Sequence, residues 1–191
     1  MNGRLIIIAS PSGGGKTSVI KRFLGSHPNI VHSISCTTRP ARRGETNGKY
    51  YQYLDRLTFE AGIKAGQFAE WAEVHNNLYG TPKEPLDIWL SEGKDVVLDL
   101  DVVGSLNLKK LYGNRAVTIF ILPPSIEELQ KRLVGRGTDS KKVRELRLEN
   151  AIEEMRHKDK FDHRVVNDVL DKACEEIESI VIASVAKQSP E

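Results

Sequence analysis

The stretch LIIIASPSGGGKT, residues 5–17, joins a short apolar run to a glycine-rich loop. Leu5 to Ala9 predicts a buried strand, and Thr17 to Leu24, with apolar residues at helical spacing, predicts a helix after the loop. A glycine-rich turn that ends in Lys-Thr between a strand and a helix is the pattern of a Walker-type phosphate-binding loop. Its backbone N–H groups surround an anion, and the helix N-terminus adds a favourable dipole. The loop therefore predicts nucleoside triphosphate binding.

Two side chains of this loop have predicted roles. Lys16 is a point charge that can bridge the outer phosphates, and the hydroxyl of Thr17 is placed to ligate Mg²⁺. Ser10 stands where the usual pattern has glycine, and we expect the loop to tolerate it because that glycine serves the turn. The alternative is a turn that binds nothing, which three glycines followed by Lys-Thr disfavour. The motif alone does not specify the reaction.

Strand and helix patterns alternate along the rest of the chain, which predicts an α/β protein with a parallel sheet. The expected elements are strands at 95–100, 116–122 and 165–166, a helix capped by Ser125 with Glu128 as capping-box partner, and a closing helix at 170–183. Asp99 and Asp101 lie at the C-terminal end of the strand at 95–100, at the sheet edge where ligands bind. Such carboxylates can hold Mg²⁺ through water or accept hydrogen bonds from a base; the alternative is charge that faces solvent.

Two segments interrupt this alternation. Residues 35–82 show few helix signals, contain four of the five tyrosines, and include predicted strands at 50–54 and 68–74, which indicates a small inserted sheet. Residues 135–158 open with Gly135-Arg136-Gly137 and continue as a charged helix, the pattern of a mobile lid. We therefore divide the chain into a core (1–34, 83–134 and 159–191), an insert (35–82) and a lid (135–158).

Composition restricts the functional class. The 191 residues suffice for one core, and a net charge of +2 gives no support for nucleic-acid or membrane binding. No stretch approaches the roughly 20 apolar residues of a membrane span, and the N-terminal apolar run is too short for a signal peptide. Cys36 and Cys174 lack metal-ligand spacing. We expect a cytoplasmic protein with two reduced thiols.

The insert carries a second set of chemically informative residues. Arg39 and Arg42 lie close together in the sequence, and arginine binds phosphate with a planar fork to which tyrosine hydroxyls can add hydrogen bonds. Glu70 is a carboxylate on a mostly apolar strand, beside Phe68 and Ala72. A carboxylate can pair with the N1–H and exocyclic amine of guanine but not with adenine. The insert thus predicts recognition of a guanine at one end and a phosphate at the other.

These motifs together resemble the bacterial guanylate kinase family over essentially the whole chain. The segments that carry the resemblance are SPSGGGKT (10–17), SCTTRPARRGE (35–45), NGKYYQY (47–53), EWAEV (70–74), LYGT (78–81), LDLD (98–101), ILPPS (121–125), KRLVGRG (131–137) and VVND (165–168). The resemblance implies a phosphate-loop kinase with a parallel-sheet core, a mixed β GMP-binding insert and a helical lid. It implies transfer of the ATP γ-phosphoryl group to GMP or dGMP with Mg²⁺ as cofactor.

The resemblance also implies roles for residues at matching positions. The GMP-binding set is Ser35, Arg39, Arg42, Glu45, Tyr51, Glu70, Tyr79, Thr81 and Asp101. The ATP-binding set is Ser12, Gly13, Gly14, Gly15, Lys16, Thr17, Ser18, Arg132, Arg136, Asn167 and Asp168. The catalytic set is Lys16, Arg39, Arg132, Arg136 and Arg147, and the metal ligands are Thr17 with Asp99 through water. Arg43, and Ala41 where proline is frequent, depart from the family pattern.

Three rival interpretations stay open at this level. A guanylate-kinase-like module that binds a phosphorylated peptide would keep the arginines but could lose the phosphate loop, and ATP binding with Mg²⁺ distinguishes it. Another phosphate-loop kinase would use a different acceptor, which a nucleotide panel would reveal. A nucleotide-dependent switch would not require the second phosphate site of the insert. We expect ATP and GMP as partners, no nucleic acid or membrane, and either a monomer or a homo-oligomer.

Overall fold

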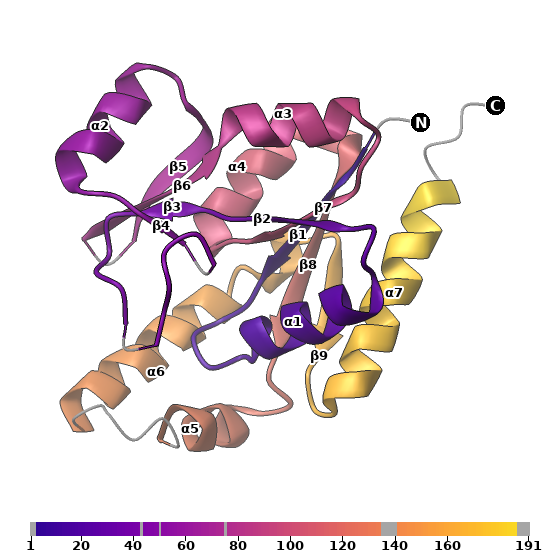
Figure 1. Ribbon diagram of the computed structural model, residues 1–191. Coiled ribbons are helices and arrows are strands. Elements are labelled where there is room, and N and C mark those ends of the chain that lie inside the picture. Colours follow the sequence, from indigo (N-terminus) through magenta and orange to yellow (C-terminus); the bar gives the residue numbers. More distant parts are fainter. Residues whose placement is uncertain (1–2, 43, 50, 75, 135–140, 187–191) are drawn as a thin grey trace.

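A five-stranded parallel sheet forms the centre of the fold (Figure 1). The computed structural model describes residues 3–42, 44–49, 51–74, 76–134 and 141–186. In sheet order the strands are β2 (Val31–Ser33), β7 (Val96–Asp99), β1 (Leu5–Ala9), β8 (Ala116–Leu122) and β9 (His163–Val166), and every neighbouring pair is parallel. The predicted α/β class with a parallel sheet is confirmed.

The alternating side chains of β1 explain why the sheet is covered on both faces. Ile6 and Ile8 pack with apolar residues of α1 (Lys16–Ser26) and α7 (Leu170–Ala186). Leu5 and Ile7 pack with those of α3 (Lys83–Ser91) and α4 (Val102–Tyr112). All four side chains are buried, and burial of one such side chain stabilises the fold by roughly 1.5–3 kcal/mol. A strand buried on both faces is continuously apolar, as this one is.

The second sheet lies at one end of the core (Figure 1). It contains β4 (Gln52–Tyr53), β3 (Cys36–Thr37), β6 (Asn77–Pro82) and β5 (Phe68–Val74), in that order. β3 and β4 are parallel, whereas β6 pairs antiparallel with both β3 and β5, so the sheet is mixed. The expected mixed sheet is therefore present, although β4 is shorter than the strand predicted at 50–54.

A helix within the insert was missed by the sequence interpretation. α2 (Arg56–Lys64) begins after Asp55, whose carboxylate accepts a hydrogen bond from the Thr58 N–H at 2.9 Å. Phe59 anchors the helix, because it is fully buried and stacks on Phe68 of β5 at 4.4 Å between ring centroids. The sequence shows few helix signals in this segment because α2 is short, and tertiary contacts of its few apolar residues stabilise it.

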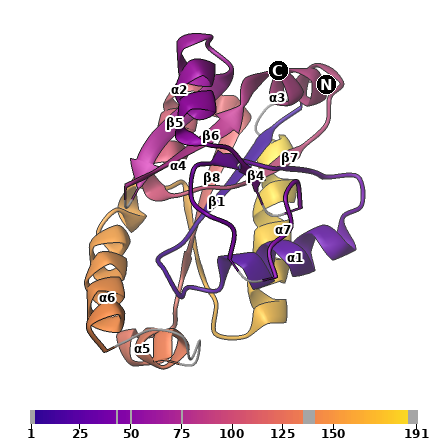
Figure 2. The ribbon, with the colours of Figure 1, turned by 60° about the vertical axis from the view of Figure 1, so that its left-hand side comes forward.

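Two helices, α5 (Ile126–Val134) and α6 (Lys141–Met155), lie together at the lower left of the molecule in Figure 2. α5 begins at Ser125, whose hydroxyl accepts a hydrogen bond from the Glu128 N–H at 3.2 Å, as the predicted cap requires. α6 packs on α5 through a buried apolar cluster. Gly135-Arg136-Gly137, the start of the predicted lid, lies outside the described residues. The short 3₁₀ helices are η1 (Gly113–Arg115) and η2 (Lys158–Lys160).

Within the described part of the chain, no helix has both the length and the apolar character that crossing a membrane requires.

Candidate active site

The glycine-rich loop leaves β1 at the carboxyl edge of the core sheet and enters α1. Gly13 and Gly15 have φ angles of 90° and 91°, a left-handed region that favours glycine. The Gly14 N–H donates to the Pro11 carbonyl at 2.9 Å, which closes the turn, and Gly15 is the N-cap of α1. The loop therefore has the backbone conformation that points N–H groups at an anion in front of a helix N-terminus.

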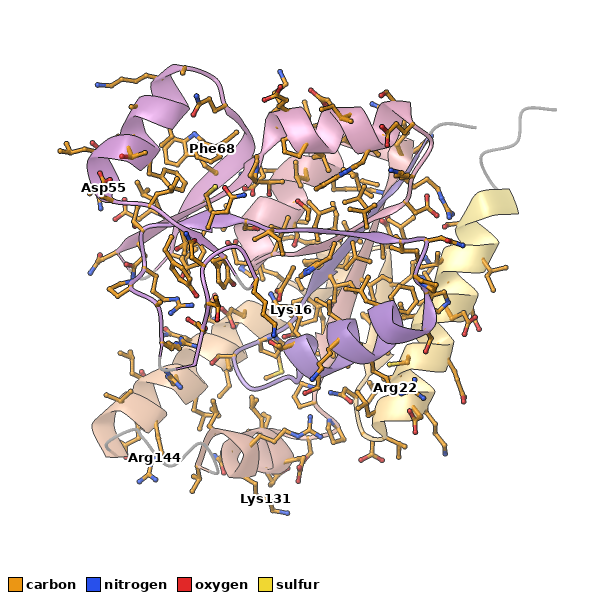
Figure 3. All side chains as sticks on the ribbon, viewed as in Figure 1. Lys16, Arg22, Asp55, Phe68, Lys131 and Arg144 are labelled. Carbon is orange, nitrogen blue, oxygen red and sulfur yellow. The ribbon has the colours of Figure 1, made fainter. Side chains whose placement is uncertain are left out.

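Lys16 lies at the start of α1, between the core and the insert (Figure 3). Its Nζ is 2.5 Å from Asp99 Oδ1 and 2.5 Å from the Leu100 carbonyl oxygen. β1 and β7 are parallel neighbours, so their carboxyl ends lie at the same edge of the sheet. Lys16 follows β1 and Asp99 ends β7, which brings the two side chains together at this edge. The ammonium group thus contacts two oxygens at the sheet edge, and the phosphate oxygens of a bound nucleotide could replace these contacts.

The oxygen donors beside Lys16 fit a magnesium ion. Thr17 presents an exposed hydroxyl in the first turn of α1, and Asp99 presents a carboxylate at the end of β7. Mg²⁺ prefers oxygen ligands and usually takes few of them from the protein, with phosphates and water supplying the rest. The residues at this edge therefore match the chemistry expected of an ion that accompanies a nucleoside triphosphate.

A buried carboxylate, that of Glu70, lies where the insert meets the core. Glu70 of β5 is 8% exposed, and its Oε1 accepts a hydrogen bond from the Thr81 hydroxyl of β6 at 2.8 Å. Burial raises the pKa of Glu70 to about 7; the Thr81 hydrogen bond opposes this shift, and the negative charge of Asp101 adds to it. Asp101 is the N-cap of α4 and accepts from the Gly104 N–H at 2.9 Å. The two acidic groups therefore face one region at the insert–core boundary.

Glu45 organises the arginine-rich loop of the insert. Arg39 Nη2 donates to both carboxylate oxygens of Glu45 at 3.1 and 2.9 Å, and the Arg42 N–H and the Tyr53 hydroxyl donate to Oε2 at 2.7 Å each. Burial opposes ionisation of Glu45, but the hydrogen bonds from Arg42, Tyr53 and Arg39 hold its pKa below the ordinary value. The Arg39 guanidinium also lies over the Tyr51 ring at 5.4 Å. Glu45 thus fixes the position of Arg39.

Two tyrosines, Tyr51 and Tyr79, lie beside the arginine-rich loop. The rings of Tyr51 and Tyr79 meet edge to face, with centroids 5.9 Å apart. Burial raises the pKa of Tyr51, and the nearby Asp99 carboxylate raises it further. Its phenol therefore stays protonated at neutral pH and can donate a hydrogen bond to an anion.

One pocket of about 490 Å³ joins these groups. Its lining comes from four parts of the molecule: the phosphate loop, the insert, the end of β7 and α6. The predicted site residues that line it are Ser12, Gly13, Gly15, Lys16, Thr17, Ser18, Ser35, Arg42, Tyr51, Glu70, Tyr79, Asp99, Asp101 and Arg147. Arg39, Glu45 and Thr81 do not line the pocket, but each contacts a residue that does. The fold thus brings together groups separated by more than 100 positions in the sequence.

Arg132 and Asn167 support the phosphate loop from behind. The Asn167 side-chain N–H donates to the Gly14 carbonyl at 3.0 Å, and Arg132 Nη2 donates to the Asn167 carbonyl at 3.0 Å. Arg132 also bonds Glu128 through Nε at 3.2 Å. Asp168, next in the chain, is exposed. Arg136, expected in both the ATP-binding and the catalytic sets, lies outside the described residues.

Two residues of this region were missed by the sequence interpretation. Glu154 of α6 lines the pocket, and its Oε2 accepts a hydrogen bond from the Ser12 N–H at 3.0 Å, so a carboxylate contacts the phosphate loop directly. Gly104 of α4 lies against the Glu70 carboxylate. No local pattern marks either residue, because each contact joins segments far apart in the chain.

The phosphate loop, the insert with its arginines and acidic residue, and the charged helix α6 line one pocket. This combination is typical of a phosphate-loop nucleoside monophosphate kinase. The guanylate kinase family model matches residues 2–184, and the chain belongs to that family. Similar proteins include the guanylate kinases of Thermotoga maritima (46% identical, over 98% of this chain and 90% of that protein) and Dechloromonas aromatica (44%, over 96% and 91%). The crystal structure of guanylate kinase from Anaplasma phagocytophilum is 33% identical, with a TM-score of 0.81 over 95% of this chain and 86% of that one.

Proposed function

We propose that this chain transfers the γ-phosphoryl group of ATP to GMP, or to dGMP, and releases ADP and GDP. The observation that supports the proposal is the pocket itself, which is lined both by the phosphate loop and by Glu70, whose carboxylate accepts a hydrogen bond from Thr81. A nucleoside monophosphate whose base contacts Glu70 would direct its phosphate toward Lys16. This arrangement supports a kinase with a purine nucleotide as acceptor, acting in purine nucleotide metabolism.

Glu70 is the group proposed to select guanine. In its ionised form it can accept hydrogen bonds from the N1–H and the exocyclic amine, and adenine offers no such pair of donors on that edge. Thr81 holds one carboxylate oxygen in place, and Asp101 supplies a second acceptor nearby. Ser35 is buried in the same wall and can contribute a hydroxyl.

The phosphate of GMP is proposed to bind the arginine-rich loop. Arg39 and Arg42 would provide charge-assisted hydrogen bonds, and Tyr51 and Tyr79 neutral ones. Glu45 holds Arg39 in place before substrate arrives, so less side-chain entropy is lost on binding.

Phosphoryl transfer requires positioning and charge rather than a protein nucleophile. A GMP phosphate oxygen, already anionic, attacks the γ-phosphorus; the new P–O bond forms as the bond to the β–γ bridging oxygen breaks, and ADP leaves with that electron pair. The loop amides and Lys16 would stabilise the ATP phosphates. The arginines proposed to stabilise the moving group are Arg39, Arg132, Arg136 and Arg147. Mg²⁺, held by Thr17 and by Asp99 through water, would neutralise phosphate charge.

The cellular setting belongs to the same proposal. We expect the enzyme to act in the cytoplasm on small nucleotides, as a monomer or a homo-oligomer, without nucleic acid as a partner.

A coupled assay of ADP release tests the proposal. The purified chain is supplied with Mg²⁺-ATP and, in separate reactions, with GMP, dGMP, AMP, CMP or UMP. We expect rapid turnover with GMP, measurable turnover with dGMP, and rates near background with the other three. ATP binding without turnover on any acceptor, or a preference for AMP, would contradict the proposed function.

A further inference from the structure

Gly104 of α4 closely approaches the proposed guanine-reading carboxylate. A Cβ atom at this position would lie 2.8 Å from Glu70 Oε2, 3.2 Å from Cδ and 3.3 Å from Oε1. Contacts below 3.0 Å essentially never occur for a Cβ atom, so any larger residue would force a shift. Glu70 and Gly104 are 34 positions apart and come from different parts of the fold: Glu70 lies on strand β5 of the insert, and Gly104 lies on helix α4 of the core.

The backbone at Gly104 does not itself require glycine. Its φ lies outside the left-handed range, and it occupies the first turn of a regular α-helix with its N–H bonded to Asp101 Oδ1. Glycine lowers helix stability relative to alanine, by up to about 1 kcal/mol in a helix interior. A residue that weakens the helix without a backbone reason indicates that the missing side chain is what matters here.

The Glu70 carboxyl group has little freedom to yield. Thr81 binds Oε1 from β6, and the carboxyl group is buried against α4. The pocket is an open direction, because Glu70 is one of its lining residues. A methyl group at Gly104 would therefore drive the carboxylate into the space that the base needs.

We propose that Gly104 is a positioning residue for guanine selection: by lacking a side chain, it sets the depth of the Glu70 carboxylate below the pocket surface. This inference rests on the proposed function, since it concerns the same acceptor site. It adds that selectivity depends on a helix of the core, in addition to the insert that carries the carboxylate.

The test compares Gly104→Ala with a matched control, Gly25→Ala. Gly25 lies in α1 with a φ outside the left-handed range, and a Cβ there would meet no atom within 4 Å. We expect Gly104→Ala to raise the KM for GMP roughly tenfold, because a misplaced carboxylate weakens charge-assisted hydrogen bonds that contribute about 1.5–3 kcal/mol. The KM for ATP should change less than about twofold in both variants. An unchanged KM for GMP in Gly104→Ala would overturn the proposal.

A second variant separates displacement of the carboxylate from general damage. Aspartate at position 70 is one methylene shorter, so the double variant Gly104→Ala/Glu70→Asp should bind GMP better than the two single effects predict when added. Strict additivity, or a double variant worse than that sum, would count against the proposal.

A third readout does not depend on activity. Titration of the ¹³C-labelled Glu70 carboxyl group in the nucleotide-free protein should show a lower midpoint in Gly104→Ala, since the group moves toward solvent, and no change in Gly25→Ala. An identical midpoint in wild type and Gly104→Ala would overturn the positioning role. If wild type fails to phosphorylate GMP while this midpoint shifts, the proposed function fails and the Gly104–Glu70 coupling stands.

Discussion

Replacement of Glu70 by glutamine should make the protein more stable and a poorer enzyme. The substitution preserves shape and leaves a carbonyl oxygen for the Thr81 hydroxyl, but it removes the charge. The proposed contact to guanine requires the negative charge of Glu70. Burial of Glu70, which is 8% exposed, makes the same charge unfavourable for folding. Opposite effects on stability and on binding are expected where a residue is retained for function.

The stability gain can be calculated from the pKa of Glu70. Burial raises it from 4.5 to about 7 in the folded protein. Because the folded value is the higher one, the favourable contribution of protonated Glu70 is fully present below pH 4.5 and is lost as pH rises through 7. At 1.36 kcal/mol per pKa unit, the cost of ionising Glu70 in the folded state reaches on the order of 3 kcal/mol at pH 8. Glu70→Gln has no such cost.

The binding loss has a similar size. Hydrogen bonds to a charged group contribute about 1.5–3 kcal/mol, so Glu70→Gln should raise the KM for GMP by roughly tenfold to hundredfold at pH 8. In the wild type, protonation of Glu70 below pH 7 has the same consequence. The wild-type KM for GMP should therefore rise by up to about tenfold for each unit of pH below 7, more steeply than that of Glu70→Gln, in which only the titration of the GMP phosphate remains.

Two measurements test this reasoning. Urea unfolding at pH 5 and pH 8 should show that the stability advantage of Glu70→Gln over wild type grows by on the order of 2 kcal/mol between these values. Steady-state assays from pH 5.5 to 8 should show the predicted rise in the wild-type KM for GMP, with the KM for ATP as internal control. Either a variant less stable than wild type at pH 8, or a wild-type KM for GMP that is flat across this range, would refute the argument.

Three further predictions concern the phosphate end of the pocket. Lys16→Ala and Arg147→Ala should each lower turnover by roughly 10³-fold or more while the unfolding midpoint changes little, and near-normal turnover by either variant would remove that residue from the catalytic set. Glu154→Gln should lower the Kd for ATP severalfold in the absence of GMP, because a phosphate no longer displaces a charged acceptor from the Ser12 N–H, and an unchanged or higher Kd by equilibrium titration would contradict this. Small-angle scattering should detect a smaller radius of gyration with a bisubstrate analogue bound, and identical dimensions would argue against closure of the lid.

The parts of this protein that follow from local sequence are those in which neighbouring residues cooperate. The stretch at 5–17 predicts a buried strand, a phosphate loop and a helix, because the apolar run, the glycines and the Lys-Thr pair act within a few residues of one another. The strand at 116–122 is equally local, with a run of β-branched residues that proline ends. The parallel sheet followed from the alternation of such strands with helical patterns.

Local patterns were weaker where an element depends on distant partners. α2 has few apolar residues of its own, and Phe59 stabilises it only because the insert places Phe68 against it. Asp101, expected at the C-terminal end of a strand, follows β7 and is also the N-cap of α4, a role that depends on where the helix begins.

The sequence by itself determined which chemical groups are available: a phosphate loop, an arginine-rich loop and the Glu70 carboxylate on a mostly apolar strand. Tertiary structure decided their arrangement and electrostatic state. Burial against α4 gives Glu70 its raised pKa, Gly104 leaves room for its carboxyl group, and Glu154 reaches the Ser12 N–H from a helix 142 positions away. The physical reason is that desolvation and contact depend on all neighbours in space, whereas a sequence pattern records neighbours along the chain.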